Sequence, residues 1–250
     1  MFRNSRHERK LLPPAIVMFL GLTVSATGQV RMPPGRAPER AAILQYMPGE
    51  VSVAPGATNQ WTAARLNQPL TPSENLWTAT NSRAEINVGD GFIRMNSEAS
   101  LTLVALNLSN VQVSVNQGEV SLTVLRLPPG EIYEIDTPNA TLTVTKTGVY
   151  RVEVKPAEEQ TLVTTRKGSI VATGLGAAVT INSGQQVSFL NGNSLQHTAQ
   201  KAAPPDGFED WASVRDKRLG ASRPPFGVVI GYGPYPYGAV AVPGPPPPLR

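Results

Sequence analysis

The sequence predicts an all-β protein, built as a sandwich, a jelly roll or a short β-solenoid, followed by one short α-helix and a proline- and glycine-rich tail. Apolar residues alternate with polar ones through the central stretch 111–154, which is the pattern of strands with one buried face. Glycine and proline interrupt that stretch at short intervals. Helical signals are confined to residues 206–219.

The central stretch shows the alternation most clearly. Val111, Val113 and Val115 are separated by polar residues, and the same spacing recurs at 120–124 and 150–154. Short segments separate the runs, and each holds a glycine able to adopt a positive φ or a proline that fixes a turn: 116–118, 128–130, 137–139 and 147–148. We therefore expect successive short strands with tight connections.

The composition excludes several kinds of site. The chain has no cysteine, which excludes disulfides, thiolate nucleophiles and zinc sites built on sulfur. Its two histidines, His7 and His197, stand in unrelated contexts and offer little to a metal centre or a catalytic triad. The formal charge of +4 arises mainly in residues 1–10, whose four cations and one anion leave 18 cations against 17 anions in the remainder. The remainder therefore has no electrostatic signature of a nucleic-acid partner.

Residues 1–28 have the layout of a secretory signal peptide. A basic segment precedes the apolar run 15–24, and small residues follow it, so cleavage after Gly28 is preferred over cleavage after Ala26. A retained membrane anchor is the alternative, although the run is shorter than the roughly 20 apolar residues that a span needs. We expect export to the periplasm or the cell exterior, with residues 29–40 as a solvated linker.

We assign residues 41–190 to one β domain. Two apolar runs around Met47–Glu50 predict that it opens with a hairpin. A glycine followed directly by a strand recurs at Gly49, Gly118 and Gly168, a weak repetition that fits wound strands as well as a sandwich. Residues 191–205, which contain Asn-Gly-Asn and Pro-Pro, are predicted to form a loop.

Residues 206–219 predict the single helix. Asp206 fits the N-cap position, and Glu209 fits the third helical position of a capping box. One face carries the side chains that we expect to dock on the β domain: Phe208, Trp211 and Arg215.

The last segment, 220–250, predicts a disordered tail. Nine prolines and five glycines fall within residues 222–250, which is too many for a packed core. Tyrosines interleaved with prolines would suit docking to a partner groove or a surface, with a plain flexible linker as the alternative: Tyr232, Tyr235 and Tyr237.

Short motifs in the β domain, taken in order, resemble the bacterial FecR family domain: Leu76-Trp77-Thr78, Ser82-Arg83-Ala84-Glu85-Ile86, Gly91-Phe92-Ile93-Arg94-Met95, Asn116-Gln117-Gly118-Glu119-Val120, Glu134-Ile135-Asp136-Thr137-Pro138 and Gly148-Val149-Tyr150-Arg151-Val152. The resemblance covers about residues 41–190. The segment 208–216 also resembles the helix that follows the domain in a secreted branch of the family.

The resemblance implies an all-β extracytoplasmic domain. In the best-known members it also implies signalling across the envelope, where the domain meets a TonB-dependent receptor and controls a sigma factor through a cytoplasmic segment. Only the basic segment of about ten residues precedes the apolar region when that region is counted from Leu11, so we expect no cytoplasmic anti-sigma domain. What carries over is a secreted protein-interaction module, and the family implies no catalytic residue.

The sequence patterns contain few candidates for catalytic or metal-binding residues. Glu131, Glu134 and Asp136 could serve acid–base catalysis or calcium binding, but alternation places Glu134 and Asp136 on one solvent-facing side of a strand, as an ordinary charged pair. The sequence has no nucleophile elbow, phosphate-binding glycine loop or zinc-protease motif. We expect His197 to be exposed, and we predict no catalytic residue, metal or cofactor.

Trp61 and Trp77 are the remaining candidates for an interaction site. They could stack on sugars or fill the core. The leading hypothesis is a non-enzymatic exported module that binds another envelope protein, in signalling or assembly. The alternative is an envelope polysaccharide-binding protein that uses exposed aromatics, and a membrane partner is expected only if the leader is retained. A polysaccharide-cleaving enzyme is disfavoured because the turns offer mostly glycine, asparagine and proline.

Overall fold

The computed structural model describes residues 40–56, 58, 60–190 and 195–221. The chain divides into two units, Met1–Gly35 and Arg36–Arg250, and every described residue belongs to the second. The predicted signal peptide, all of the linker except Arg40, and the tail beyond residue 221 lie outside the described residues.

The β domain is a sheet folded into two layers that share one long strand, β9 (Asn110–Val124). The first half of β9 pairs with β8 and β10, and its second half pairs with β7 and β12. Layer A contains the second half of β9 and, in order across the layer, β4 (Gln68–Leu70), β1 (Ala42–Tyr46), β6 (Ala84–Asn87), β7 (Gly91–Met95), then β12 (Gly148–Lys155), β13 (Gln160–Lys167), β16 (Gln185–Leu190) and β17 (Gln196–Lys201).

Layer B contains the first half of β9. Its other strands are, in order, β3 (Thr62–Ala63), β2 (Val51–Ala54), β5 (Asn75–Thr78), β8 (Ser100–Leu106), then β10 (Ile132–Asp136), β11 (Thr141–Val144), β14 (Ser169–Gly174) and β15 (Ala177–Asn182). A short 3-10 turn (Pro156–Glu158) joins β12 to β13, and α1 (Gly207–Ala221) follows β17. The strand pairs are antiparallel except for β9 with β10.

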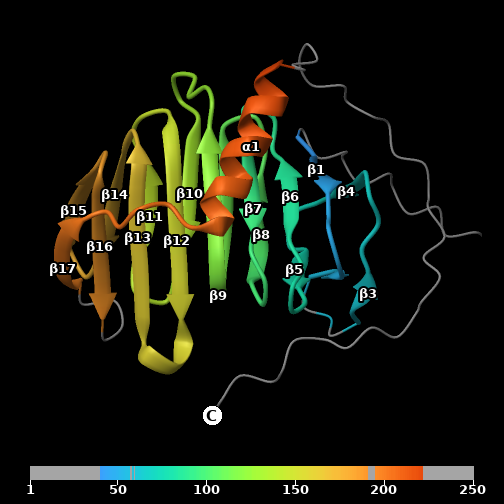
Figure 1. Cartoon of the computed structure of the whole chain (residues 1–250), viewed down its shortest axis with the longest axis horizontal. Coiled ribbons are helices and arrows are strands. Elements are labelled where there is room, and N and C mark those ends of the chain that lie inside the picture. The colour runs from blue at the N-terminus through green and yellow to red at the C-terminus, as the bar shows by residue number, and fades with distance from the viewer. Residues whose placement is uncertain (1–39, 57, 59, 191–194, 222–250) are drawn as a thin grey trace, which may run out of the picture. The chain divides into compact units, whose positions relative to one another are not determined.

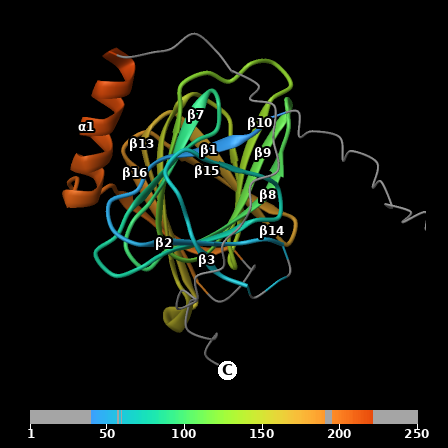
Figure 2. The ribbon, with the colours of Figure 1, turned by 90° about the vertical axis from the view of Figure 1, so that its right-hand side faces the viewer.

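The chain passes repeatedly between the layers as it advances. The strand colours therefore progress from blue to orange across Figure 1. Seen along that direction in Figure 2, α1 lies beyond the strands of layer A, while β8, β9 and β14 lie on the opposite side. The fold thus combines the layers of a sandwich with the progressive winding of a solenoid. For the residues that the structure describes, the prediction of an all-β protein with one helix is confirmed.

The core lies between the layers and follows the predicted alternation. Val111, Val113 and Val115 are buried, and so are the alternate residues of 120–124 and 150–154. No helix within the described residues has both the length and the apolar character that crossing a membrane requires.

Gly118 marks the point at which β9 changes layers. The segment 116–118, predicted as a turn between two strands, is instead a bend inside one strand. Gly118 has φ +79°, and a Cβ built on it would lie 2.6 Å from the Cα of Ala99. Only glycine fits this bend without strain.

Two further sequence predictions are corrected. Met47–Glu50 does not close a hairpin, because β1 belongs to layer A and β2 to layer B. Residues 191–205 are not a continuous loop, because 196–201 form β17 against β16. Every residue of β17 is exposed, so this edge strand has no apolar alternation that could reveal it.

Candidate interaction site

Helix α1 begins at the predicted cap. Oδ1 of Asp206 accepts hydrogen bonds from the backbone N–H groups of Phe208 (3.0 Å) and Glu209 (3.1 Å). The Glu209 carboxylate turns to the sheet, where it accepts hydrogen bonds from Arg151 and Arg166. The first turn of the helix is therefore fixed to layer A through charged groups.

The second half of the helix is held by a buried group of charges, which we call the Glu85 cluster. Nε of Arg94 donates to Glu85 (2.7 Å), while its Nη2 donates to Asp216 of the helix (2.7 Å) and its Nη1 to Thr123 (3.1 Å). Nη2 of Arg215, also on the helix, donates to Glu85 (2.5 Å). The side chains of Glu85 and Arg94 are fully buried, so helix and sheet complete one ion network.

The balance of forces on Glu85 favours its charged form. Burial raises the pKa of this carboxyl, but hydrogen bonds from Arg215 and Arg94 outweigh burial and hold the pKa below its usual range. The hydrogen bonds to Glu85 raise the pKa of Arg215, although burial acts in the opposite direction. The cluster is therefore a salt network at neutral pH.

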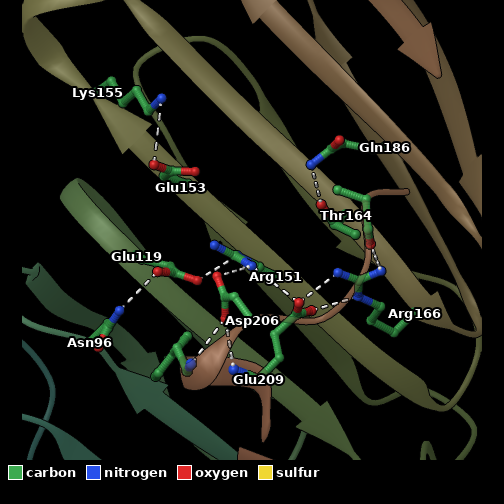
Figure 3. A network of polar contacts seen from close by, with 12 residues as sticks. Asn96, Glu119, Arg151, Glu153, Lys155, Thr164, Arg166, Gln186, Asp206 and Glu209 are labelled. Atoms are coloured by element: carbon green, nitrogen blue, oxygen red, sulfur yellow. Dashed lines mark hydrogen bonds and ion pairs between the residues drawn. The ribbon is translucent and has the colours of Figure 1, made fainter. Parts of the chain in front are cut away.

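A second network joins the first turn of the helix to β9, β12 and β13 (Figure 3). Arg151 pairs with Glu119 on the sheet and donates to Asp206 (2.7 Å) and Glu209 (3.1 Å) of the helix. Arg166 donates two hydrogen bonds to the Glu209 carboxylate, from Nε to Oε1 (2.6 Å) and from Nη2 to Oε2 (2.5 Å). Burial raises the pKa of Glu119, against the opposing effect of Arg151. For Asp206, burial is outweighed by hydrogen bonds from the Glu209 amide and by Arg151, so its pKa is lowered.

Aromatic rings between the two networks are stacked with cations. The guanidinium of Arg83 lies over Trp211 (5.1 Å to the ring centroid) and Phe208 (5.7 Å). That of Arg215 lies 4.0 Å from the ring centroid of Tyr46. These cation–π contacts add to the attachment of the helix.

A hollow of about 360 Å³ opens beside these rings. It is lined by Tyr46, Pro48, Asn81, Arg83, Ser97 and Trp211. Another hollow, of about 490 Å³, lies where the chain leaves β17, and it is lined by Arg166, Gly184 and residues 201–205. Arg166 already forms an ion pair with Glu209. The hollow of about 360 Å³ is lined instead by Arg83, for which no ion pair is found among the described residues.

The structure does not bring the predicted interaction residues together. Trp77 lies in β5 and is only 8% exposed, while Trp61 is half-buried just before β3. Neither takes part in a ring pair with another described residue. The tyrosines of the tail, Tyr232, Tyr235 and Tyr237, lie outside the described residues.

The remaining candidates have structural partners. Glu131 pairs with Arg40, and one amide nitrogen of Gln112 donates to both Glu134 and Asp136, at 2.8 Å each. Burial, followed by the nearby Asp136 carboxylate, raises the pKa of Glu134.

Side chains able to bind metal are not gathered in the described ranges. Within them, no group of three or more His, Asp or Glu side chains could hold a metal ion. His197 is exposed on β17, with Nδ1 2.8 Å from the carbonyl oxygen of Leu195.

Sequence reasoning missed the sheet side of the interface. It identified the docking face of the helix but assigned no role to Glu85, Arg94, Arg151 or Arg166. The available signal was a row of charged residues on alternate positions of β6, β7, β12 and β13, opposite a helix that also carries charges on its docking face.

Comparison with known protein families supports the resemblance over the centre of the β domain. A family model described as FecR protein matches residues 74–171. This range runs from just before β5 into β14 and contains all the motifs on which the predicted resemblance rests, but it ends before α1. The resemblance to the FecR family is confirmed for these residues. No curated protein matches the chain.

Two solved structures from Parabacteroides distasonis, each described as a candidate anti-sigma factor, are similar to the chain at 15% sequence identity. One has a TM-score of 0.45 and is matched over 51% of this chain and 59% of its own. The other has a TM-score of 0.46, with 56% and 64% covered. The chain thus spans about six-tenths of the length of these structures.

Proposed function

We propose that the protein is a non-enzymatic regulatory module of the FecR type, exported to the bacterial cell envelope, where it binds another envelope protein in signalling or assembly. The observation that carries this proposal is the FecR match over residues 74–171, the central strands of both layers. The match supports a signalling-related role. Export rests on the signal-peptide layout of residues 1–28.

The chemistry of the interface supports a binding role over a catalytic one. The charged groups beneath α1 engage one another: Glu85 with Arg94 and Arg215, and Glu209 with Arg151 and Arg166. A general acid or base needs a carboxyl that can exchange a proton near neutral pH. The lowered pKa of Glu85 and its fixed partners fit a structural salt network instead.

Export can be tested by fractionating cells that express the chain with a C-terminal tag and measuring the intact mass of the tagged product. We expect a periplasmic or secreted form that begins at Gln29. The matched control replaces Leu20 with Asp, which breaks the apolar run and should leave the full-length chain in the cytoplasm. A wild-type product that keeps residues 1–24 would contradict cleavage.

Partner binding can be tested in the native cells by mild crosslinking and mass spectrometry of the tagged product. We expect a stoichiometric envelope protein that is absent when the tag is carried by the signal peptide alone. Recovery of membrane material only, with the leader retained, would favour an anchored scaffold. Cleavage of glycans by the purified protein would overturn the non-enzymatic assignment.

A further inference from the structure

The hollow beside Trp211 is a small, open site lined by residues of the helix and of the β domain. Its volume of about 360 Å³ lies at the low end of ligand pockets, which span roughly 300–1,000 Å³. Tyr46 ends β1, Trp211 comes from α1, and Arg83 immediately precedes β6. The site therefore exists only while the helix is docked.

Arg83 supplies the positive charge of this pocket, and no carboxylate among the described residues pairs with it. Its Nε donates a hydrogen bond to Oδ1 of Asn96 (3.1 Å), and its guanidinium group lies over the rings of Trp211 and Phe208. Among the described residues, no ion pair is formed by Arg83, whereas ion pairs at this interface are formed by each of four other arginines: Arg94, Arg151, Arg166 and Arg215. The terminal nitrogens of Arg83 are thus donors fixed in position and not used within the described part of the chain.

The surroundings of Arg83 favour an incoming anion. No acid lines the pocket. Two carboxylates on neighbouring segments have partners of their own: Glu98 accepts a hydrogen bond from Thr80, while Glu119 accepts one from Asn96 and forms an ion pair with Arg151. A guanidinium matches a carboxylate with two parallel hydrogen bonds, and its positioning here lowers the entropy that binding costs.

The aromatic rings distinguish between kinds of ligand. A sugar ring would need a free aromatic face, but the ring of Trp211 already contacts Arg83 and Phe208, and that of Tyr46 contacts Arg215. Beside these rings, the lining offers Pro48 and one cation, Arg83. Such a lining suits a short acidic side chain flanked by apolar residues.

We propose that this pocket binds an Asp or Glu side chain of an extended peptide segment of the partner protein. The proposal rests on the protein-binding function proposed above and identifies where the partner docks. It assigns Arg83 as the carboxylate receptor, with Asn81 and Ser97 as polar neighbours at the rim.

The test is a titration of the ¹⁵N-labelled protein, residues 29–250, followed by NMR. The probes are acetyl-Ala-Pro-Glu-Pro-Ala-amide and the same peptide with Gln in place of Glu. We expect the Glu peptide to shift the Trp211 indole and the Ser97 amide and to bind about tenfold more tightly than the Gln peptide, because it adds a charged hydrogen-bonded pair. Rising salt should weaken the Glu peptide selectively.

Three variants isolate the role of Arg83. Arg83→Met should abolish the preference for Glu over Gln. Asn81→Asp places a negative charge at the exposed rim, leaves the helix contacts intact and should weaken the Glu peptide severalfold; Asp tolerates the positive φ of +58° found there. Arg65→Met, which removes an exposed arginine away from the pocket, should change nothing.

Several outcomes would overturn the proposal. These are equal binding of the two peptides, no shift with either at 10 mM, or a preference that survives both Arg83→Met and Asn81→Asp. Tighter binding of a galacturonate trisaccharide than of the Glu peptide would reject a peptide ligand. None of these outcomes bears on export or on the crosslinked partner, so a failure of this site is distinguishable from a failure of the proposed function.

Discussion

Arg94→Met tests whether the buried charges hold the helix to the sheet. Arg94 is fully buried, donates to Glu85, Asp216 and Thr123, and lies over the ring of Phe92 at 5.4 Å. Methionine retains the aliphatic stem and removes the donors. Among the described residues, Glu85 then keeps only Arg215 and Gln45 as partners, and Asp216 keeps only its longer 3.3 Å contact with Thr123.

The expected loss is large because one member of a buried pair remains uncompensated. Removing one partner of such a pair costs roughly 3–5 kcal/mol. A body of this size loses about 2–4 °C of melting temperature per kcal/mol, so we expect a fall of roughly 6–20 °C. The matched control, Lys155→Met, removes a partly exposed cation that lies 3.6 Å from Glu153. It should cost no more than about 1 kcal/mol.

The measurement is urea unfolding of residues 29–250, followed by circular dichroism for the sheet and by tryptophan fluorescence for the helix interface. The double variant Glu85→Gln/Arg94→Met removes both buried charges and should recover part of the loss. A loss from Arg94→Met no greater than that from Lys155→Met would refute the buried network as the anchor of the helix.

Three further predictions follow from the same geometry. Gly118→Val should lower the free energy of unfolding by roughly 2–5 kcal/mol, because a Cβ there meets Ala99 and φ is positive; an unchanged urea midpoint would contradict the bend. Trp211→Ala should cost about 1–3 kcal/mol and speed proteolysis within α1, because the ring contacts Phe208 and Arg83; equal proteolysis rates would show that the ring does not hold the helix. Because the folded pKa of Glu85 is depressed, its stabilisation should be complete above the unfolded pKa of about 4.3 and lost as pH falls through the lower folded value. The stability difference between wild type and Glu85→Gln, measured by urea unfolding from pH 7 to pH 3, should stay constant and then shrink below about pH 4. A difference that grows on acidification would show that folding raises the pKa of Glu85 instead of lowering it.

The strands were predictable because the alternation of apolar and polar residues indicates which side chains are buried. Val111 and Val152 face the core as expected. The division into layers was not predictable, because each layer has one buried face and therefore the same period-two pattern. Gly49 illustrates the limit: it begins a connection between layers, with φ +91° and Ser82 packed against it, but in the sequence it looks like a hairpin turn.

The candidate site was only half predictable, for a related reason. In the sequence, Phe208 and Trp211 are recognisable as apolar residues on one helical face, and Asp206 is recognisable as the N-cap. Charged residues on alternate strand positions, such as Arg94 and Arg151, are usually solvent-facing, and nothing local tells that a helix distant in sequence will cover them. Arg94 and Asp216 are 122 residues apart, so their pairing depends on the fold as a whole.

The polar character of this interface determines how firmly the helix is held. A helix of 15 residues is marginal in isolation, and among its residues of described burial only Phe208 and Ala212 are fully covered. Charged groups provide most of the remaining attachment, and water can solvate them if the helix leaves, whereas an apolar stripe would be costly to expose. Undocking therefore costs less here than it would for an apolar face. Since the Arg83 pocket needs both Trp211 and the sheet, a ligand in it would stabilise the docked helix by mass action.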